Sequence, residues 1–295
     1  MRGVFMKSRE LLLLIKLSKG IGIHGEALIY DWLVQEQKCT EVEPSAEKLV
    51  QIARIKPPHK QQFIQDFNQN VNLLKLHQLQ AQLFITILDA DYPDQLREIY
   101  LPPIVLFYAG NGELLKSDWL LGVVGARKAS HYSIETLRNI VRPAVSQGLT
   151  VVSGLAEGVD KLSHQCAISV GQPTIGVIGT GLDVFYPKTN EALQREMSEK
   201  QLVISEYPAG TSGARHHFPE RNRIIAGLVQ TLLVTEARHQ SGSLITANLA
   251  LQENRNVLAI PGDVTRLLST GCNELIAAGA KPILSADDIL EEFRF

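Results

Sequence analysis

Apolar residues recur every three to four positions along the first 83 residues, which is the spacing of one buried face on an α-helix. The positions that follow this spacing are Leu11, Leu12, Ile15, Ala27, Leu28, Tyr30, Trp32, Leu33, Leu49, Ile52, Ile55, Phe63, Phe67, Leu73 and Leu74. The pattern predicts a small all-helical domain over residues 1–83.

A glycine-rich run, Lys19–Gly25, lies between the first two predicted helices. Such a run resembles a helix-hairpin-helix turn, whose backbone N–H groups can hold a DNA phosphate. Glycine also lets two helices turn back on each other without any ligand. We favour the turn.

From residue 84 the pattern changes to short apolar runs separated by glycines and amphipathic segments, which is typical of a parallel sheet covered on both faces. The predicted strands are Leu120–Val124, Thr150–Ser153, Thr174–Ile178, Leu202–Ser205, Thr231–Val234 and Asn256–Ile260, with Phe84–Leu88 and Ile104–Tyr108 as further strands at one edge. We therefore predict an α/β fold with an extended Rossmann-like, parallel or mixed sheet over residues 84–295.

Composition limits the classes of protein to consider. The 295 residues fit two domains, and the net charge of -2 means that any nucleic-acid binding depends on local clusters of Lys and Arg. Cys39, Cys166 and Cys272 show no spacing of a metal site or a disulfide framework, which favours a reducing cytoplasm. The apolar run Leu11–Ile15 is too short to span a bilayer, so we expect no membrane anchor. Either Met1 or Met6 is the natural start.

Several predicted strands end in small or polar residues, and the carboxyl ends of parallel strands share one edge of a sheet, where ligands bind. These strand ends are Gly125–Arg127, Ser153–Ala156, Gly179–Gly181 and Ser205–Glu206, and Gly242 lies in a loop of the same kind. Glycine there lets backbone N–H groups approach a phosphate closely.

Basic residues near these strand ends indicate an anion site. The cations are Arg127, Lys188, Arg221 and Arg223, with Asn190 and Asn222 as uncharged donors, and the loop that opens the helix after Thr231–Val234 carries Ser241, Gly242, Ser243 and Thr246. Guanidinium groups together with a helix start suit phosphate. The alternative is that Arg221 and Arg223 form a solvated ion-pair network with Glu220 and Glu206.

Enzymatic chemistry is not supported. The run Gly176–Gly181 lacks the glycine spacing of a dinucleotide fingerprint, and no phosphate-binding lysine loop is present, so we expect no cofactor. No metal-ligand set and no nucleophile with its base stands out. His216 and His217 are interpreted as a polar loop near phosphate. Tyr132, Phe185, Tyr186 and Phe218 either stack on bases or, as we favour for most of them, pack in the core.

The chain resembles the DprA/Smf family of DNA-processing proteins of bacterial natural transformation. The segments that carry the resemblance are Gly122–Arg127 with Ser130 and Tyr132, Ser153–Asp160, Gly181–Pro187, Ser205–Glu206, Phe218–Gly227, Ser241–Ala247, Pro261–Gly262, Gly271–Ile276 and Gly279–Ala280. They span nearly the whole predicted α/β domain in order.

The resemblance implies a SAM-like N-terminal domain, a Rossmann fold that dimerises, sequence-independent binding of single-stranded DNA, and loading of RecA recombinase onto that DNA. It implies that Gly125, Arg127, Lys188 and Asn190 contact DNA. Many members carry a C-terminal winged-helix domain, and this chain stops at Phe295. Two other functions stay open: a small-nucleotide sensor, and a phosphoribohydrolase-like enzyme, for which the expected glutamate near Ser241–Ala247 is missing.

Overall fold

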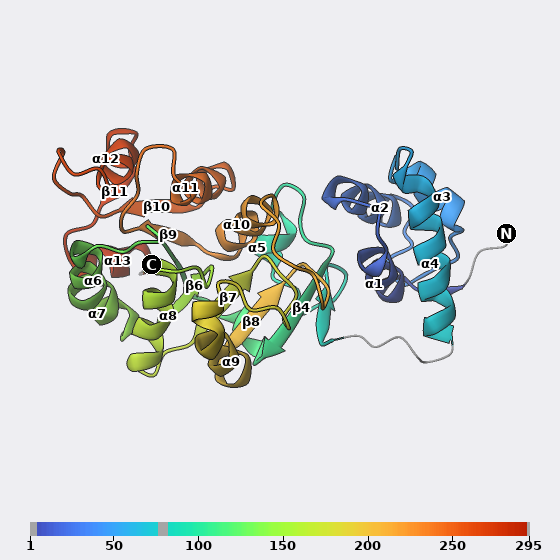
Figure 1. Ribbon diagram of the computed structural model, residues 1–295, viewed down its shortest axis with the longest axis horizontal. Coiled ribbons are helices and arrows are strands. Elements are labelled where there is room, and N and C mark those ends of the chain that lie inside the picture. The colour runs from blue at the N-terminus through green and yellow to red at the C-terminus, as the bar shows by residue number, and fades with distance from the viewer. Residues whose placement is uncertain (1–4, 76–81, 294–295) are drawn as a thin grey trace. The chain divides into compact units, whose positions relative to one another are not determined.

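The computed structural model describes residues 5–75 and 82–293. The chain divides into two compact units: unit 1 is residues 1–107 with 206–208, and unit 2 is residues 108–205 with 209–295. Figure 1 labels the α-helices of both units and most of the strands of unit 2. The predicted domain boundary at residues 83 and 84 falls inside unit 1, and Met1 lies outside the described residues.

Unit 1 contains the predicted helices. They are α1 (Ser8–Leu17), α2 (Ile23–Gln35), α3 (Ala46–Ile52) and α4 (His59–Lys75). Leu11, Leu14 and Phe63 are fully buried, as expected for the apolar face of each helix. The unit also holds a short antiparallel pair that the sequence pattern did not predict, β1 (Met6–Lys7) and β2 (Glu41–Val42). A two-residue strand is too short to show an alternating pattern.

The glycine-rich run between α1 and α2 packs closely against the start of α4. Gly20 has a φ of +89°, and a Cβ on it would lie 2.7 Å from the His59 carbonyl oxygen. A side chain at this position would therefore be both strained and crowded. This backbone conformation lets the chain turn from α1 into α2.

The remainder of unit 1 contains β3 (Phe84–Thr86), α5 (Asp94–Arg97) and the first part of β4 (Val105–Gly110). β3 and β4 pair in antiparallel fashion, with Phe84 opposite Phe107. The two further strands that we predicted around these positions are thus confirmed, although β3 is shorter than the apolar run.

Unit 2 alternates strands and helices. Its strands are β5 (Leu120–Val124), β6 (Thr150–Ser153), β7 (Thr174–Ile178), β8 (Leu202–Ser205), β9 (Thr231–Val234), β10 (Asn256–Ala259) and β11 (Lys281–Pro282). Its helical segments are η1 (Gly112–Lys116), α6 (His131–Thr136), η2 (Leu137–Val141), α7 (Arg142–Val145), α8 (Val159–Ser169), η3 (Lys188–Asn190), α9 (Glu191–Lys200), α10 (His217–Leu228), α11 (Gly242–Gln252), α12 (Thr270–Ala277), α13 (Ala286–Leu290) and η4 (Glu291–Phe293). The predicted strands of this region are confirmed, with β10 one residue shorter than expected.

The strands β11-β10-β9-β5-β6-β7-β8 follow one another across the sheet of unit 2. The pairs between neighbours in this series are parallel. The chain starts at β5, builds outward to β8, and returns to the other side of β5 with β9 before building outward again. The strand order therefore reverses between β5 and β9, and a reversal of this kind leaves a crevice outside the carboxyl ends of the two strands.

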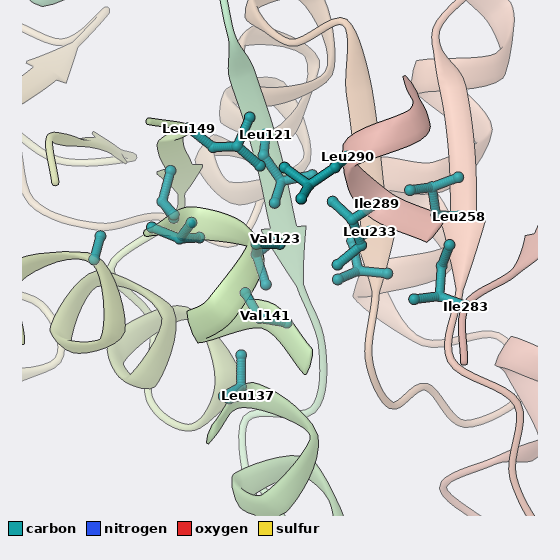
Figure 2. Close-up of a cluster of buried hydrophobic side chains, with 14 of the residues drawn as sticks. Leu121, Val123, Leu137, Val141, Leu149, Leu233, Leu258, Ile283, Ile289 and Leu290 are labelled. Atoms are coloured by element: carbon teal, nitrogen blue, oxygen red, sulfur yellow. The ribbon is translucent and has the colours of Figure 1, made fainter. Parts of the chain in front are cut away.

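A large part of the core of unit 2 lies on one face of this sheet. Figure 2 shows Leu121 and Val123 of β5 gathered with Leu233 of β9 and Leu258 of β10, close to side chains of η2 and α13. The strands β5 to β9 are buried at every residue because helices cover both faces of the sheet. This rigid sheet fixes the positions of the loops at its edge.

Candidate functional site

A cavity of about 620 Å³ opens beyond the carboxyl ends of β5 and β9, where the strand order reverses. It is formed by the loops after β5, β6 and β9, by the first half of α10 and by the start of α11. Its lining residues are Val124, Gly125, Ala126, Arg127, Lys128, Ala156, Asp160, Phe218, Arg221, Asn222, Ile225, Ala237, Arg238, Ser241, Gly242, Ser243, Thr246 and Leu268. We call it the larger cavity.

Most of the predicted site residues meet in the larger cavity: Gly125, Arg127, Arg221, Asn222, Ser241, Gly242, Ser243 and Thr246 line it. Lys188, Asn190 and Arg223 do not. Lys188 is exposed on η3 and pairs with Glu191 at 2.7 Å. Asn190 and Arg223 are buried, as is Arg221, so neither arginine lies in a solvated surface network.

Two basic residues that the sequence analysis did not single out, Lys128 and Arg238, also line the larger cavity. Lys128 directly follows Arg127, and Arg238 lies four residues beyond the end of β9. The position of Arg238 after a predicted strand was a usable signal. With Arg127 and Arg221 they place four cations around one hollow, which favours an anionic ligand.

The start of α11 supplies uncharged groups to the same cavity. Ser241 is the N-cap residue, and its Oγ is buried without a hydrogen-bond partner among the described residues. Ser243 Oγ donates to the carbonyl oxygen of Gly125 at 2.8 Å, which ties α11 to the loop after β5. The first N–H groups of a helix have no partners within the helix, and they carry partial positive charge. This end of α11 is suited to an oxyanion.

Glycines allow the loops to approach each other. A Cβ on Gly125 would lie 2.6 Å from Val159 Cγ2 and 2.7 Å from Thr235 Oγ1. Gly158 has a φ of +76°, and a Cβ there would lie 2.3 Å from the Ala126 carbonyl oxygen. The loop after β5 and the start of α8 therefore pack without room for side chains.

Arg221 has a structural role besides lining the cavity. Its Nη1 donates to the carbonyl oxygens of Gly154 and Val177, which follow β6 and belong to β7, and its Nε donates to Asn222 Oδ1 at 3.2 Å. A guanidinium held in this way is fixed in place. It contributes positive charge to the cavity from a rigid position.

Two buried titratable groups lie beside Arg221. Burial raises the pKa of the Asp160 carboxyl above its usual range, although the Arg221 guanidinium and the backbone N–H groups of Ala156 and Gly154 act in the opposite direction. Burial lowers the pKa of His164 to about 3, and Arg221 adds to the effect. His164 is therefore neutral at pH 7, with Nδ1 2.7 Å from Thr174 Oγ1.

A smaller cavity of about 70 Å³ adjoins the larger one. Arg127, Ala156, Phe218 and Arg221 line both. The smaller cavity also has Tyr186 in its lining, and the rings of Tyr186 and Phe218 are 5.3 Å apart. Apolar rings thus lie next to the basic hollow.

The other candidate aromatic and histidine residues are engaged within the protein. Tyr132 donates its hydroxyl to the Pro261 carbonyl oxygen. The ring of Phe185 lies 4.3 Å from the guanidinium of Arg195 and 5.8 Å from Lys188 Nζ. His217 Nδ1 is 3.1 Å from the carbonyl oxygen of Gly179, so this histidine helps to hold the loop after β7.

Over residues 5–75 and 82–293, no group of three or more His, Cys, Asp and Glu side chains is arranged to hold a metal ion. Within the same ranges, no helix is both long enough and apolar enough to cross a membrane.

Comparison with known proteins gives a family match and close relatives. Residues 83–294 match the family described as DNA recombination-mediator protein A. The chain is 48% identical over 210 residues to DNA processing protein DprA of Streptococcus pneumoniae, covering 71% of this chain and 74% of that protein. It is 37% identical over 279 residues to protein Smf of Synechocystis, covering 93% of this chain and 68% of that protein.

Solved structures of DNA-processing proteins align with this one. The X-ray structure of DprA from Streptococcus pneumoniae aligns with a TM-score of 0.87 at 39% identity, covering 98% of this chain and 99% of that one. DNA processing protein A from Helicobacter pylori, whose structure was described for its single-stranded DNA binding mode, aligns with a TM-score of 0.65 at 26% identity, covering 72% and 96%.

Proposed function

Because the chain belongs to the DNA recombination-mediator protein A family, which confirms its resemblance to DprA and Smf proteins, we propose that it binds single-stranded DNA without regard to sequence. The observation that carries the proposal is the larger cavity, in which four basic side chains and the start of α11 surround one hollow. The single-stranded DNA binding described for the Helicobacter pylori relative supports it.

Phosphate contacts explain why binding would not depend on sequence. Lys and Arg side chains and helix N-termini contact the backbone, which is the same in every strand. Arg127, Lys128 and Arg238 are exposed and lie around the hollow, so a strand's phosphates can reach them. Tyr186, which is 51% exposed, and Phe218 offer rings next to these cations, and stacking on aromatic rings tolerates any base.

We further propose that the protein passes its bound strand to RecA recombinase during natural transformation in competent cells, and that it acts in the cytoplasm as a binding protein and not as an enzyme. The description of the family as recombination mediators supports a recombinase partner. Faster assembly of RecA filaments on a single strand preincubated with the protein would support this step, and an unchanged rate would contradict it.

We also propose a homodimer. Two cavities linked in one particle raise the effective concentration of the second contact, so long strands should bind more tightly than short ones. Equal length dependence in a dimerisation-defective variant would rule out this explanation.

Fluorescence anisotropy of a labelled homopolymeric single strand tests the proposed function. We expect salt-sensitive binding that neither duplex DNA nor free ATP displaces. Neutralising one phosphate contact should lower the slope of log K against log salt by about one, so Arg127→Ala should weaken binding and flatten this slope. Arg138→Ala changes an exposed arginine outside both cavities and serves as the control.

Displacement of the strand by ATP would instead identify a small-nucleotide site. Absence of strand binding by the wild-type chain would refute the proposal, and an Arg127→Ala variant with wild-type affinity at every salt concentration would remove Arg127 from the site.

A further inference from the structure

The loop from Gly154 to Gly158, between β6 and α8, contributes to the lining of both cavities, and Gly154 and Glu157 line the smaller one. Ala156 lines both of them. Leu155 has a φ of +53°, in the left-handed region. A residue that carries a side chain adopts this unfavourable conformation only where its surroundings hold it in place. The conformation of the loop therefore depends on its contacts.

Buried polar side chains hold the loop through hydrogen bonds to its backbone. Asn190, which is 3% exposed, donates its side-chain amide to the carbonyl oxygens of Leu155 at 2.9 Å and Ala156 at 3.0 Å. Arg221 donates to the carbonyl oxygen of Gly154. The Asp160 carboxyl accepts from the backbone N–H groups of Gly154 and Ala156. Each residue from Gly154 to Ala156 is thus held by at least one buried side chain.

The remaining atoms of Asn190 do not suit a contact with phosphate. An amide nitrogen has two hydrogens, and here it donates to two carbonyl oxygens. Its Oδ1 is buried, without a partner among the described residues, and can only accept, as phosphate oxygens do. Asn190 also lines neither cavity. It could reach a phosphate only by releasing the loop.

We propose that Asn190 is a positioning residue: it acts on the bound strand by holding the Leu155–Ala156 turn, which places Ala156 in the lining of both cavities, and it does not touch DNA. This inference rests on the proposed function and changes the role that the Lys188–Asn190 motif implies for its asparagine. Lys188, two residues earlier, has a side chain that is 79% exposed and available to a strand.

Hydrogen–deuterium exchange of the strand-free protein separates positioning from contact. In Asn190→Ala we expect the peptide spanning residues 154–158 to exchange about tenfold faster, since opening of the loop loses two buried hydrogen bonds. Exchange elsewhere in unit 2 should stay as in the wild type. Lys188→Ala, the matched control from the same turn, should leave the loop unchanged.

Strand binding should differ between the same two variants. Asn190→Ala should bind a homopolymeric single strand about tenfold more weakly, with an unchanged salt slope, because no charge is removed. Lys188→Ala should lower the salt slope by about one if its ammonium contacts a phosphate. Asn190→Ala with weaker binding but unchanged loop exchange would mean direct contact and would overturn the proposal.

The pH dependence of strand binding by Asn190→Asp is a readout that general destabilisation of the protein would not change. The ionised carboxylate of this variant would face two carbonyl oxygens, whereas the protonated acid can donate one hydrogen bond to the loop. The affinity of Asn190→Asp relative to Asn190→Ala should therefore rise as the pH falls from 8 to 5.5. A ratio that does not change with pH would count against positioning by hydrogen bonds.

These outcomes are distinct from failure of the proposed function. If the wild-type chain binds no strand, both the proposed function and this inference fail. If it binds and Asn190→Ala binds equally well, only the role of Asn190 is refuted.

Discussion

The basic residues around the larger cavity all carry a positive charge, but their side chains differ in how freely they can move. Arg127, Lys128 and Arg238 are exposed, whereas Arg221 is buried and donates to backbone carbonyl oxygens. The exposed cations can adjust to a flexible strand, and the fixed one keeps the field in place when the strand leaves. Identical side chains in a sequence thus serve as ligand contacts or as parts of the framework, depending on burial.

Gly125 shows what close packing at this site demands of single residues. Gly125→Ala would place a methyl group 2.6 Å from Val159 Cγ2, and we expect it to lower the free energy of unfolding by about 1–3 kcal/mol through overpacking. Urea unfolding measures this change. Gly242→Ala is the matched control, because a Cβ there would meet nothing within 4 Å. A stability of Gly125→Ala equal to that of Gly242→Ala would show that the loops can move apart.

Among the elements, α11 contributes to the cavity through its first turn. Ser241 occupies the N-cap position of this helix and lines the cavity without a side-chain capping hydrogen bond, and Ser243 fastens the helix to the loop after β5. The partial positive charge at a helix start adds to that of the cations only when the helix axis points at the ligand. The positions of β9 and β10, between which α11 runs, provide this direction.

Ser241→Asp separates the stability of the helix start from ligand binding. Aspartate caps a helix about as well as serine, so we expect the free energy of unfolding to stay within about 0.5 kcal/mol of the wild type. Single-strand affinity should fall about tenfold because the new carboxylate would repel phosphate. Urea unfolding and anisotropy measure the two effects.

The control for this change is Ser45→Asp, which makes the same substitution at the N-cap of α3 in unit 1. It should leave strand affinity unaltered. Equal losses of affinity in both variants would mean that net charge, and not the position of α11, causes the effect.

At the scale of the whole molecule, the order of strands decides where function can reside. The sheet of unit 2 reverses between β5 and β9, and the larger cavity lies beyond these strands. The buried polar groups below it, Asp160 and His164, belong to the first turns of α8. The same residues therefore contribute to the stability of the whole fold and to the shape of the site.

Stability should depend on pH through His164. Its pKa is about 3 in the folded protein, against 6.5 for a histidine in an unfolded chain, so below pH 6.5 the unfolded chain takes up a proton that the folded one does not. Stability from this residue is therefore lost as the pH falls, by about 1.4 kcal/mol between pH 7.5 and 5.5. Asp160 has a raised pKa, so at pH values above its unfolded pKa its contribution to stability increases as the pH falls, which opposes the effect of His164.

Urea unfolding of the wild type and His164→Leu at pH 7.5 and 5.5 tests this dependence. The difference in unfolding free energy between the two proteins should shift by about 1.4 kcal/mol in favour of the variant at the lower pH. His131→Gln changes a histidine whose side chain is 86% exposed and should show no such shift. A constant difference between wild type and His164→Leu would mean that His164 takes up its proton in the folded state.

The sequence by itself determined the local elements and the kind of chemistry. Helices in the first 75 residues and the strands of unit 2 follow from hydrophobic periodicity, because one buried face per element leaves a repeating pattern. Cations that follow strand ends, such as Arg127, indicated an anion site because the carboxyl ends of parallel strands lie at one edge of the sheet. The two-residue pair of Met6–Lys7 with Glu41–Val42 left no pattern to detect.

Only the tertiary structure decided which side chains meet. Lys128 and Arg238 enter the larger cavity because β9 returns beside β5, a pairing of strands more than a hundred residues apart that periodicity cannot reveal. Asn190 and Arg221 read as donors in the sequence, yet the fold directs them to the backbone carbonyl oxygens of Leu155, Ala156 and Gly154. Residue type fixes what a side chain can donate, whereas long-range packing determines to which group it donates.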